Sequence, residues 1–333
     1  MSEMTVVALD AMGGDNAPGE MVKGAVDAVN KSKEITVLLF GDEKIVSDEL
    51  NKYKFDADRL KIVPTTEVIA TDEHPVQAIT KKKDSSLVRA LKAVKNGEAD
   101  AIVSAGNSGA LLAGGQVLIG RIKGVKRAPF APIIPTEKGP ALLLDAGANV
   151  DCKPENLVQF AKMGSIYMKS IIGREPRVGI LNLGAEEEKG NALVKETFPL
   201  LKETEGINFI GSVETRDIPF GYADVIVCEA FTGNAVLKMF EGVAKLFGKL
   251  MKKAFKRNLI STIGAALSIK SLKKELMNYD VSTYGGAPML GLRGLVVKTH
   301  GSAKHTEITN SIMQCVDFKN QKILELIQAE LGE

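Results

Sequence analysis

The sequence predicts an α/β protein in which helices cover both faces of a mostly parallel β-sheet. Short runs of β-branched and aliphatic residues recur along the 333-residue chain, and amphipathic segments lie between them. Within each run the residues are apolar at successive positions instead of alternating with polar ones. Strands of this kind are buried on both faces, which is typical of a parallel sheet between two layers of helices. A doubly wound sheet is therefore the expected architecture.

Eight strands are expected in order along the chain. They cover residues 5–10, 35–40, 60–64, 100–105, 141–146, 177–183, 207–211 and 224–229. Two helices are marked at both ends, since one begins after Asp84 or Ser85 and ends at Gly97, and the other begins at Pro154 and ends at Gly173. Small polar residues and proline favour helix starts, and glycine favours helix ends.

The composition narrows the class of protein. The net charge is only +2, and aromatic residues make up 5% of the chain with no Trp, which argues against a stacking platform for nucleic acid. Cys152, Cys228 and Cys315 lie far apart without a CxxC pair, as expected of reduced thiols. The N-terminus lacks a signal-peptide pattern, and no apolar run reaches about 18 residues. We therefore expect residues 1–333 to form a single cytoplasmic domain that binds neither nucleic acid nor a metal.

Polar, glycine-containing loops follow five of the expected strands. They span residues 10–18, 104–110, 145–154, 182–191 and 229–238. Because ligands bind at the carboxyl ends of parallel strands, we expect these loops to share one edge of one sheet. One such loop alone is typical of a tight turn with a helix cap. Five together favour a site where backbone N–H groups and helix N-termini bind a multiply charged anion.

Several catalytic motifs are absent from the sequence. There is no GxGxxG after a strand, no P-loop and no GxSxG, and His74, His300 and His305 form no evident Ser–His pair. A covalent nucleophile is therefore not favoured. Direct attack by a bound small molecule is favoured instead, with the protein supplying position and electrostatic stabilisation.

Two side chains in these loops have two interpretations each. Lys189 could hold an anion or stabilise a developing oxyanion, or it could be a solvated lysine beside three glutamates. Asn234 could be a hydrogen-bonding group of the site or a helix cap, and taken alone the cap is the better interpretation.

Residues 236–277 predict a basic, amphipathic helical hairpin. An apolar stripe at helical spacing passes through Leu237, Phe240, Val243, Phe247, Leu250, Met251 and Phe255, and resumes after a turn near Asn258 at Ile260, Ile263, Leu267 and Leu272. From Lys238 to Lys274 there are ten basic residues and one acidic residue, Glu241. The charge favours an acidic partner or an anionic membrane surface. A packed hairpin or a dimer interface with a solvated lysine face is the alternative, and both can hold together.

Blocks of sequence along nearly the whole chain carry a family resemblance. They are DAMGGDNAP (10–18), KKKDSSL (81–87), SAGNSGA (104–110), LLDAGANVD (143–151), KGN (189–191), FTGN (231–234), YGGAPMLGL (284–292) and HGS (300–302). In this order they resemble the bacterial acyl carrier protein:phosphate acyltransferase (PlsX) family of phospholipid synthesis. The resemblance implies a Rossmann-like three-layer α/β/α fold of the isocitrate/isopropylmalate dehydrogenase type, related to phosphotransacetylases, with a protruding helical hairpin.

The resemblance also implies the reaction, in which a long fatty acyl group passes from acyl carrier protein to inorganic phosphate. The acyl phosphate product would feed a membrane glycerol-3-phosphate acyltransferase, and no cofactor is implied. Phosphate would lie in the loops 10–15 and 104–109, with Lys189 nearby, at Asp10, Gly13, Gly14, Asp15, Gly106 and Gly109. One phosphate oxygen would attack the thioester carbonyl, while donors from Asn107, Ser108 or Asn234 stabilise the oxyanion.

The implied partners are acyl carrier protein and a second copy of the chain. The acidic carrier would dock on basic surface such as Arg121, Lys123, Lys126 and Arg127, or on the hairpin. Contacts of the hairpin with the carrier or with a membrane surface would involve Lys249, Leu250, Lys253 and Phe255. Two departures from the family pattern stand out. Ser108 replaces the usual Thr and keeps a hydroxyl. Glu229-Ala230 replaces the common Asp-Gly, which puts in doubt any role that requires a short carboxylate or a special backbone angle at that loop.

Three other functions fit parts of the sequence. A metal- and nicotinamide-dependent decarboxylating dehydrogenase would share the fold type, but the sequence shows no compact Asp-x-x-x-Asp arrangement for a divalent metal. A phosphotransacetylase would use acyl-CoA as the donor. A non-catalytic membrane-surface scaffold would use the hairpin but would not need so many polar glycine loops.

Overall fold

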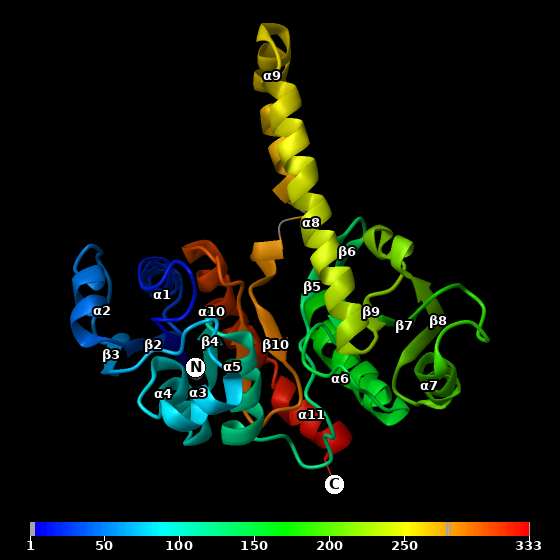
Figure 1. Ribbon diagram of the computed structural model, residues 1–333, viewed down its shortest axis with the longest axis horizontal. Coiled ribbons are helices and arrows are strands. Elements are labelled where there is room, and N and C mark those ends of the chain that lie inside the picture. The colour runs from blue at the N-terminus through cyan, green and yellow to red at the C-terminus, as the bar shows by residue number, and fades with distance from the viewer. Residues whose placement is uncertain (1–3, 278, 280, 333) are drawn as a thin grey trace. The chain divides into compact units, whose positions relative to one another are not determined.

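The computed structural model describes residues 4–277, 279 and 281–332, and the chain divides into two compact units (Figure 1). Unit 1 comprises Met1–Pro132 and Ser282–Glu333, and unit 2 comprises Ile133–Val281. Each unit has a sheet of its own. That the two units together make up the single domain expected for residues 1–333 stays a prediction.

Unit 1 is built on a six-stranded sheet of order β10-β11-β4-β1-β2-β3. Its strands are β1 (Thr5–Asp10), β2 (Ile35–Gly41), β3 (Leu60–Pro64), β4 (Ala101–Ser104), β10 (Ala287–Met289) and β11 (Leu295–Lys298). All neighbours are parallel except β10, which pairs antiparallel with β11 at the edge. Leu9, Leu39 and Ile102 are completely buried in it, as expected of strands covered on both faces.

Helices lie on both faces of this sheet, α1 and α10 on one and α4 and α5 on the other (Figure 1). They are α1 (Gly19–Lys31), α2 (Glu43–Leu50), α3 (Pro75–Lys81), α4 (Ser86–Lys95), α5 (Ser108–Gly114), α10 (His305–Asn320) and α11 (Ile323–Leu331), and a π-helical segment, Gly115–Ile119, continues α5. The start and end predicted for α4 are confirmed, because the Ser85 side chain accepts a hydrogen bond from Val88 N–H and the helix ends just before Gly97.

Unit 2 is built on a five-stranded sheet of order β5-β6-β9-β7-β8. The strands are β5 (Ile133–Thr136), β6 (Gly139–Leu144), β7 (Arg177–Asn182), β8 (Asn208–Glu214) and β9 (Val225–Val227), and the helices are α6 (Pro154–Ile172), α7 (Ala192–Glu203), α8 (Ala230–Phe255) and α9 (Leu259–Met277). Only the β5–β6 hairpin is antiparallel. The boundaries predicted for α6, Pro154 and Gly173, are confirmed.

All eight predicted strands are confirmed, but the prediction that they form one sheet is wrong. The loops 10–18 and 104–110 follow strands of unit 1, whereas the other three follow strands of unit 2. Apolar runs locate a strand but do not say which strand it pairs with. Three short strands were also missed. They are β11 and two strands, β5 and β10, that contain proline and lie at sheet edges.

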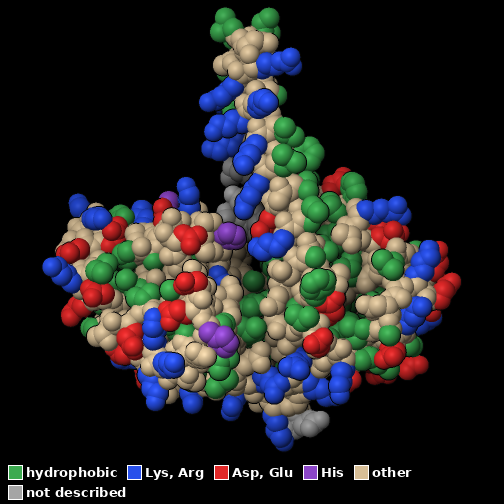
Figure 2. Space-filling view, viewed as in Figure 1, with side chains coloured by type: hydrophobic (Ala, Val, Ile, Leu, Met, Phe, Trp, Pro, Cys, Tyr) green, Lys and Arg blue, Asp and Glu red, His purple; other side chains and the backbone are tan. Residues whose placement is uncertain are grey.

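The predicted hairpin is confirmed as two long helices, α8 and α9, that run away from the sheet of unit 2 (Figure 1). Near its base, Val236, Leu237 and Phe240 pack against the core of unit 2. Further along, Phe247 is 61% exposed and Leu267 is 82% exposed. Figure 2 shows lysine and arginine side chains beside this apolar surface. In the described part of the chain, no helix combines the length and the apolar character that crossing a membrane requires.

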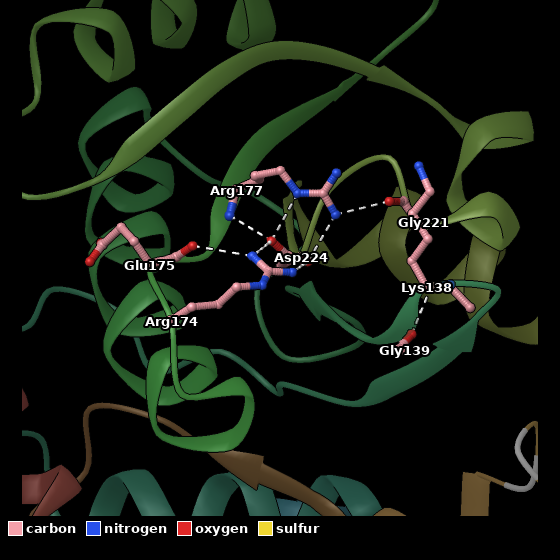
Figure 3. A network of polar contacts seen from close by, with 8 residues as sticks. Lys138, Gly139, Arg174, Glu175, Arg177, Gly221 and Asp224 are labelled. Carbon is pink, nitrogen blue, oxygen red and sulfur yellow. Dashed lines mark hydrogen bonds and ion pairs between the residues drawn. The ribbon is translucent and has the colours of Figure 1, made fainter.

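An ion network fixes the amino-terminal ends of β7 and β9 in unit 2 (Figure 3). Asp224, only 4% exposed, accepts two hydrogen bonds of 2.9 Å from Arg174 and three more from the backbone and side chain of Arg177. Burial by itself would raise the pKa of Asp224, but the bonds from Arg177 and Arg174 hold it far below its usual value. This end of the sheet is opposite the loops that follow the strands, so the network serves stability.

We expect Asp224→Ala to lower the free energy of unfolding by about 2 to 3 kcal/mol, because it removes several charge-assisted hydrogen bonds. A carboxyl with a lowered folded-state pKa stabilises fully above its unfolded pKa of about 3.9, and this contribution is lost as pH falls below it. The difference between wild type and variant in urea unfolding should therefore shrink below about pH 4.

Glu175→Ala is the matched control for this experiment. Glu175 pairs with Lys169 at 2.7 Å in a pair whose side chains are 47% and 61% exposed, so its loss should cost less than about 1 kcal/mol. Equal losses for the two variants, or a difference that does not change with pH, would contradict the role given to Asp224.

Candidate functional site

The two loops predicted to bind phosphate in unit 1 leave the sheet at its topological switch point. The chain forms β1, β2 and β3 in one direction across the sheet, and then places β4 on the other side of β1. The segments after β1 and β4 therefore diverge from the carboxyl ends of two adjacent strands. In open α/β sheets this is where ligands bind.

Asp10 is the last residue of β1, and its carboxylate is buried beneath both loops. It is 2% exposed and accepts hydrogen bonds from the hydroxyls of Ser86, at 2.6 Å, and Ser104, at 2.7 Å. Burial raises the pKa of Asp10 above its ordinary value, while the two serines and the nearby Lys298 act in the opposite direction. Both carboxylate oxygens are thus engaged within the protein.

The glycines of these loops are required by close packing as well as by backbone conformation. A Cβ atom on Gly13 would lie 2.3 Å from an Asp10 carboxylate oxygen, and one on Gly109 would lie 2.5 Å from Pro75. Gly14 has a φ of +99°, which side chains disfavour. Three of the predicted backbone donors are used internally: the N–H groups of Gly13, Asp15 and Gly106 donate to Asp10 O, Gly301 O and Ser104 Oγ.

Asn107 and Ser108 have different surroundings although they are adjacent. The Asn107 side chain caps α5 by accepting from Ala110 N–H at 2.9 Å. Its amide nitrogen donates to the carbonyls of Ala70, Thr71 and Glu73, each at 3.1 Å. Asn107 therefore fixes a neighbouring loop, and its amide group is already occupied. Ser108, the first residue of α5, is exposed, and amides in the first turn of a helix have no intrahelical acceptor.

In unit 2, Asn234 lies in the first turns of α8, and its interpretation as a helix cap is wrong. The cap is Glu229, whose carboxylate accepts from Thr232 N–H at 3.0 Å. This explains why Glu-Ala can stand here: the longer carboxylate reaches the first turn, and Ala230 has ordinary helical geometry as the first residue of α8. Asn234 is exposed, and its Oδ1 lies 4.0 Å from the position that a Cβ on Gly147 would take.

The start of α8 packs tightly on the loop after β6. A Cβ on Gly233 would lie 1.9 Å from the carbonyl oxygen of Asp145, and Ala230 N–H donates to Asn149 O at 2.9 Å. Asp145 is fully buried and accepts from the backbone and side chain of Asn149. The loop 145–149 and the first turn of α8 therefore form one rigid piece.

Lys189 lies at the surface of the loop after β7 in an ion pair with Glu186. The closest nitrogen–oxygen distance is 2.8 Å, and the two side chains are 52% and 50% exposed. The hydrogen bond to Glu186 raises the pKa of Lys189, so the side chain is cationic at neutral pH. A pair this exposed contributes little to stability and can exchange for another anion.

The remaining predicted contact residues are also at the surface. Arg121 and Lys123 are exposed in unit 1, in a loop anchored by the buried Ile122 and Val125. In the hairpin, Lys249, Leu250 and Lys253 are exposed and Phe255 is half-buried. Within the described residues, no three or more His, Cys, Asp or Glu side chains are grouped so as to hold a metal ion.

The chain is similar to known proteins along almost its whole length. The family model described as "Fatty acid synthesis protein" matches residues 5–326. A phosphate acyltransferase of Clostridium acetobutylicum is 46% identical over 329 residues, 98% of this chain and 99% of its own. One of Alkaliphilus oremlandii is 49% identical over 325 residues, 96% of each chain.

Two solved structures share the fold at low sequence identity. A phosphotransacetylase from Staphylococcus aureus has a TM-score of 0.59 at 16% identity and covers 94% of each chain. A 4-hydroxythreonine-4-phosphate dehydrogenase from Klebsiella pneumoniae has a TM-score of 0.54 at 12% identity and covers 95% of this chain and 100% of its own. The Rossmann-like α/β/α fold is therefore shared by acyl-transferring and dehydrogenase chains.

Proposed function

The chain belongs to the fatty acid synthesis family of phosphate acyltransferases (PlsX), and from this membership we propose that acyl-acyl carrier protein is its acyl donor and acyl phosphate its product. The protein is an acyltransferase, so the dehydrogenase alternative is set aside. The observation that carries the proposal is the pair of glycine loops at the switch point of unit 1, which is the position where open α/β sheets bind ligands.

In the proposed reaction, an oxygen of inorganic phosphate attacks the thioester carbonyl carbon. A C–O bond forms, the C–S bond breaks, and the carrier leaves as a thiolate. Phosphate is already anionic near neutral pH, so its orientation and the stabilisation of the oxyanion matter more than a strong base. We assign phosphate binding to the loops 10–15 and 104–109 of unit 1 and hydrogen bonding to the oxyanion to Ser108. The roles of Asn234 and Lys189 in stabilising negative charge are proposed from the family resemblance alone.

The proposed carrier-docking surface is either the exposed basic loop of unit 1 around Arg121 and Lys123 or the lysines of the hairpin. Acyl carrier protein is acidic, so complementary charge would increase its rate of encounter with these surfaces. Acyl phosphate is a reactive mixed anhydride. Its proposed consumer is a membrane glycerol-3-phosphate acyltransferase.

The donor is tested by incubating the purified protein with acyl-acyl carrier protein or acyl-CoA, with and without phosphate. We expect acyl phosphate only when phosphate is present, and a higher kcat/KM with the carrier than with CoA. The value for the carrier should fall as salt rises, because exposed charges are screened. Faster turnover of acyl-CoA would show that acyl-CoA, and not acyl-acyl carrier protein, is the donor. Liposome binding without thioester cleavage would favour the scaffold alternative.

Lys189→Ala and Asn234→Ala should each lower kcat/KM by about 100-fold, the usual effect of losing one group that stabilises an oxyanion. Both residues are exposed, so the folded state should be retained. Lys202→Ala is the matched control, because Lys202 forms a similar surface pair with Glu187 at 3.2 Å. If Lys189→Ala is as active as Lys202→Ala, the role of Lys189 is wrong.

The hairpin is proposed to contact an anionic membrane surface and to take part in a homodimer. Its support is the exposed apolar surface next to ten basic residues between Lys238 and Lys274. Apolar side chains that enter the lipid interface and lysines that face anionic headgroups are the two components of such binding.

Leu250→Glu combined with Phe255→Glu should reduce binding to vesicles of anionic phospholipid at least about tenfold, since two charges would have to enter the apolar interface. Leu326→Glu is the control, because Leu326 is 50% exposed and Leu250 is 51% exposed, but Leu326 lies in α11. Cosedimentation measures the bound fraction. Equal binding by both variants would show that the hairpin does not insert.

A further inference from the structure

One buried carboxylate connects three separate parts of unit 1. Asp10 ends β1, Ser86 begins α4, and Ser104 ends β4. The two serines are 76 and 94 residues from Asp10 in the sequence, and both are at most 1% exposed. Their hydroxyls donate to different oxygens of the carboxylate, at 2.6 and 2.7 Å. Charge-assisted hydrogen bonds of this length are the stronger kind.

The same carboxylate is the surface on which both loops pack. A Cβ on Gly13 would lie 2.3 Å from Asp10 Oδ2, and one on Gly106 would lie 3.1 Å from the same atom. The Ser104 hydroxyl also accepts from Gly106 N–H at 3.0 Å, so the loop after β4 is bonded to the group that binds the carboxylate. The position of Asp10 thus sets the spacing between the backbones of the two loops.

Direct contact between Asp10 and phosphate is a poor alternative. Both carboxylate oxygens already accept hydrogen bonds, and the side chain is 2% exposed. An anion placed against an ionised carboxylate would be repelled, most strongly in a site of low dielectric. A positive charge near this site is that of Lys298 on β11. Its ammonium donates a hydrogen bond to Ala105 O at 3.4 Å, where the loop 104–109 begins.

We propose that Asp10 is a positioning residue that holds the loops 10–15 and 104–109 at the spacing phosphate requires, and that Ser86 and Ser104 hold Asp10 in place. The inference rests on the proposed phosphate site at these loops. It gives Ser86, a residue of the KKKDSSL block with no role in the reaction so far, an effect on phosphate affinity from outside the site.

The test uses the full-length protein and inorganic phosphate as the probe. Phosphate affinity is measured by ³¹P NMR titration without any acyl donor, and the KM for phosphate and kcat are measured with acyl-acyl carrier protein. Ser86→Ala should weaken phosphate binding and raise its KM about tenfold, the value of one hydrogen bond to a charged group, with kcat at saturating phosphate within about twofold. Ser86→Thr keeps the hydroxyl and should restore most of the affinity.

Ser311→Ala is the matched control, because Ser311 is a fully buried serine of α10 whose hydroxyl donates to Glu307 O. It should change the melting temperature but leave phosphate affinity unchanged. Asp10→Asn keeps the shape of the side chain and should weaken phosphate binding. Tighter binding by Asp10→Asn would indicate direct repulsion and overturn the inference. So would a Ser86→Ala variant that, like Ser311→Ala, changes only the melting temperature.

The proposed donor is tested separately from this inference. If the wild type binds phosphate but transfers no acyl group from the carrier, the donor is wrong, and the affinities of the variants still decide the role of Asp10. If the wild type does not bind phosphate, the assigned site and the role of Asp10 are both overturned.

Discussion

Parallel pairing of β1 with strands on both of its sides is the constraint on which the rest of unit 1 depends. Because β2 and β4 both pair with β1, the chain must reverse its direction across the sheet, and the loops after β1 and β4 separate at that point. The reversal leaves the end of β1 enclosed on every side. A carboxylate there must be satisfied by protein groups, since an unpaired buried charge is costly. Ser86 and Ser104 satisfy Asp10, and the glycines leave space for it.

In unit 2, helix packing instead of a buried carboxylate holds a loop in place. There the loop after β6 is held by the helix that follows β9, through the contact of Gly233 with the carbonyl of Asp145 and the bond from Ala230 to Asn149. Glu229 begins that helix with a carboxylate long enough to reach the N–H of Thr232. Asn234 thereby lies on a rigid helical turn, as its proposed role in stabilising charge in a transition state requires.

The sequence predicts where strands and helices lie in this chain better than it predicts which strands pair and which side chains bond. Eight strands and the ends of α4 and α6 follow from apolar runs and capping residues, which depend on neighbours in the chain. The division into two sheets could not be predicted, because the apolar run 141–146 carries no information about pairing. FTGN contains two common cap residues, yet Glu229 caps the helix. Asn107 is a candidate site residue from the sequence, but its bonds to Ala70, Thr71 and Glu73 depend on the tertiary fold.

Glycines near the start of α8 are packed differently from glycines further along the hairpin of α8 and α9. Gly233 has no room for even one additional carbon atom, whereas Gly242, Gly248 and Gly264 have no atom within 4 Å of the position a Cβ would take. A side chain at Gly233 would therefore have to displace the loop after β6, whereas a side chain at any of the other three glycines would meet no atom of the described chain. The start of α8, which carries Asn234, is thus fixed by packing, while the rest of the hairpin has room at its glycine positions for larger side chains.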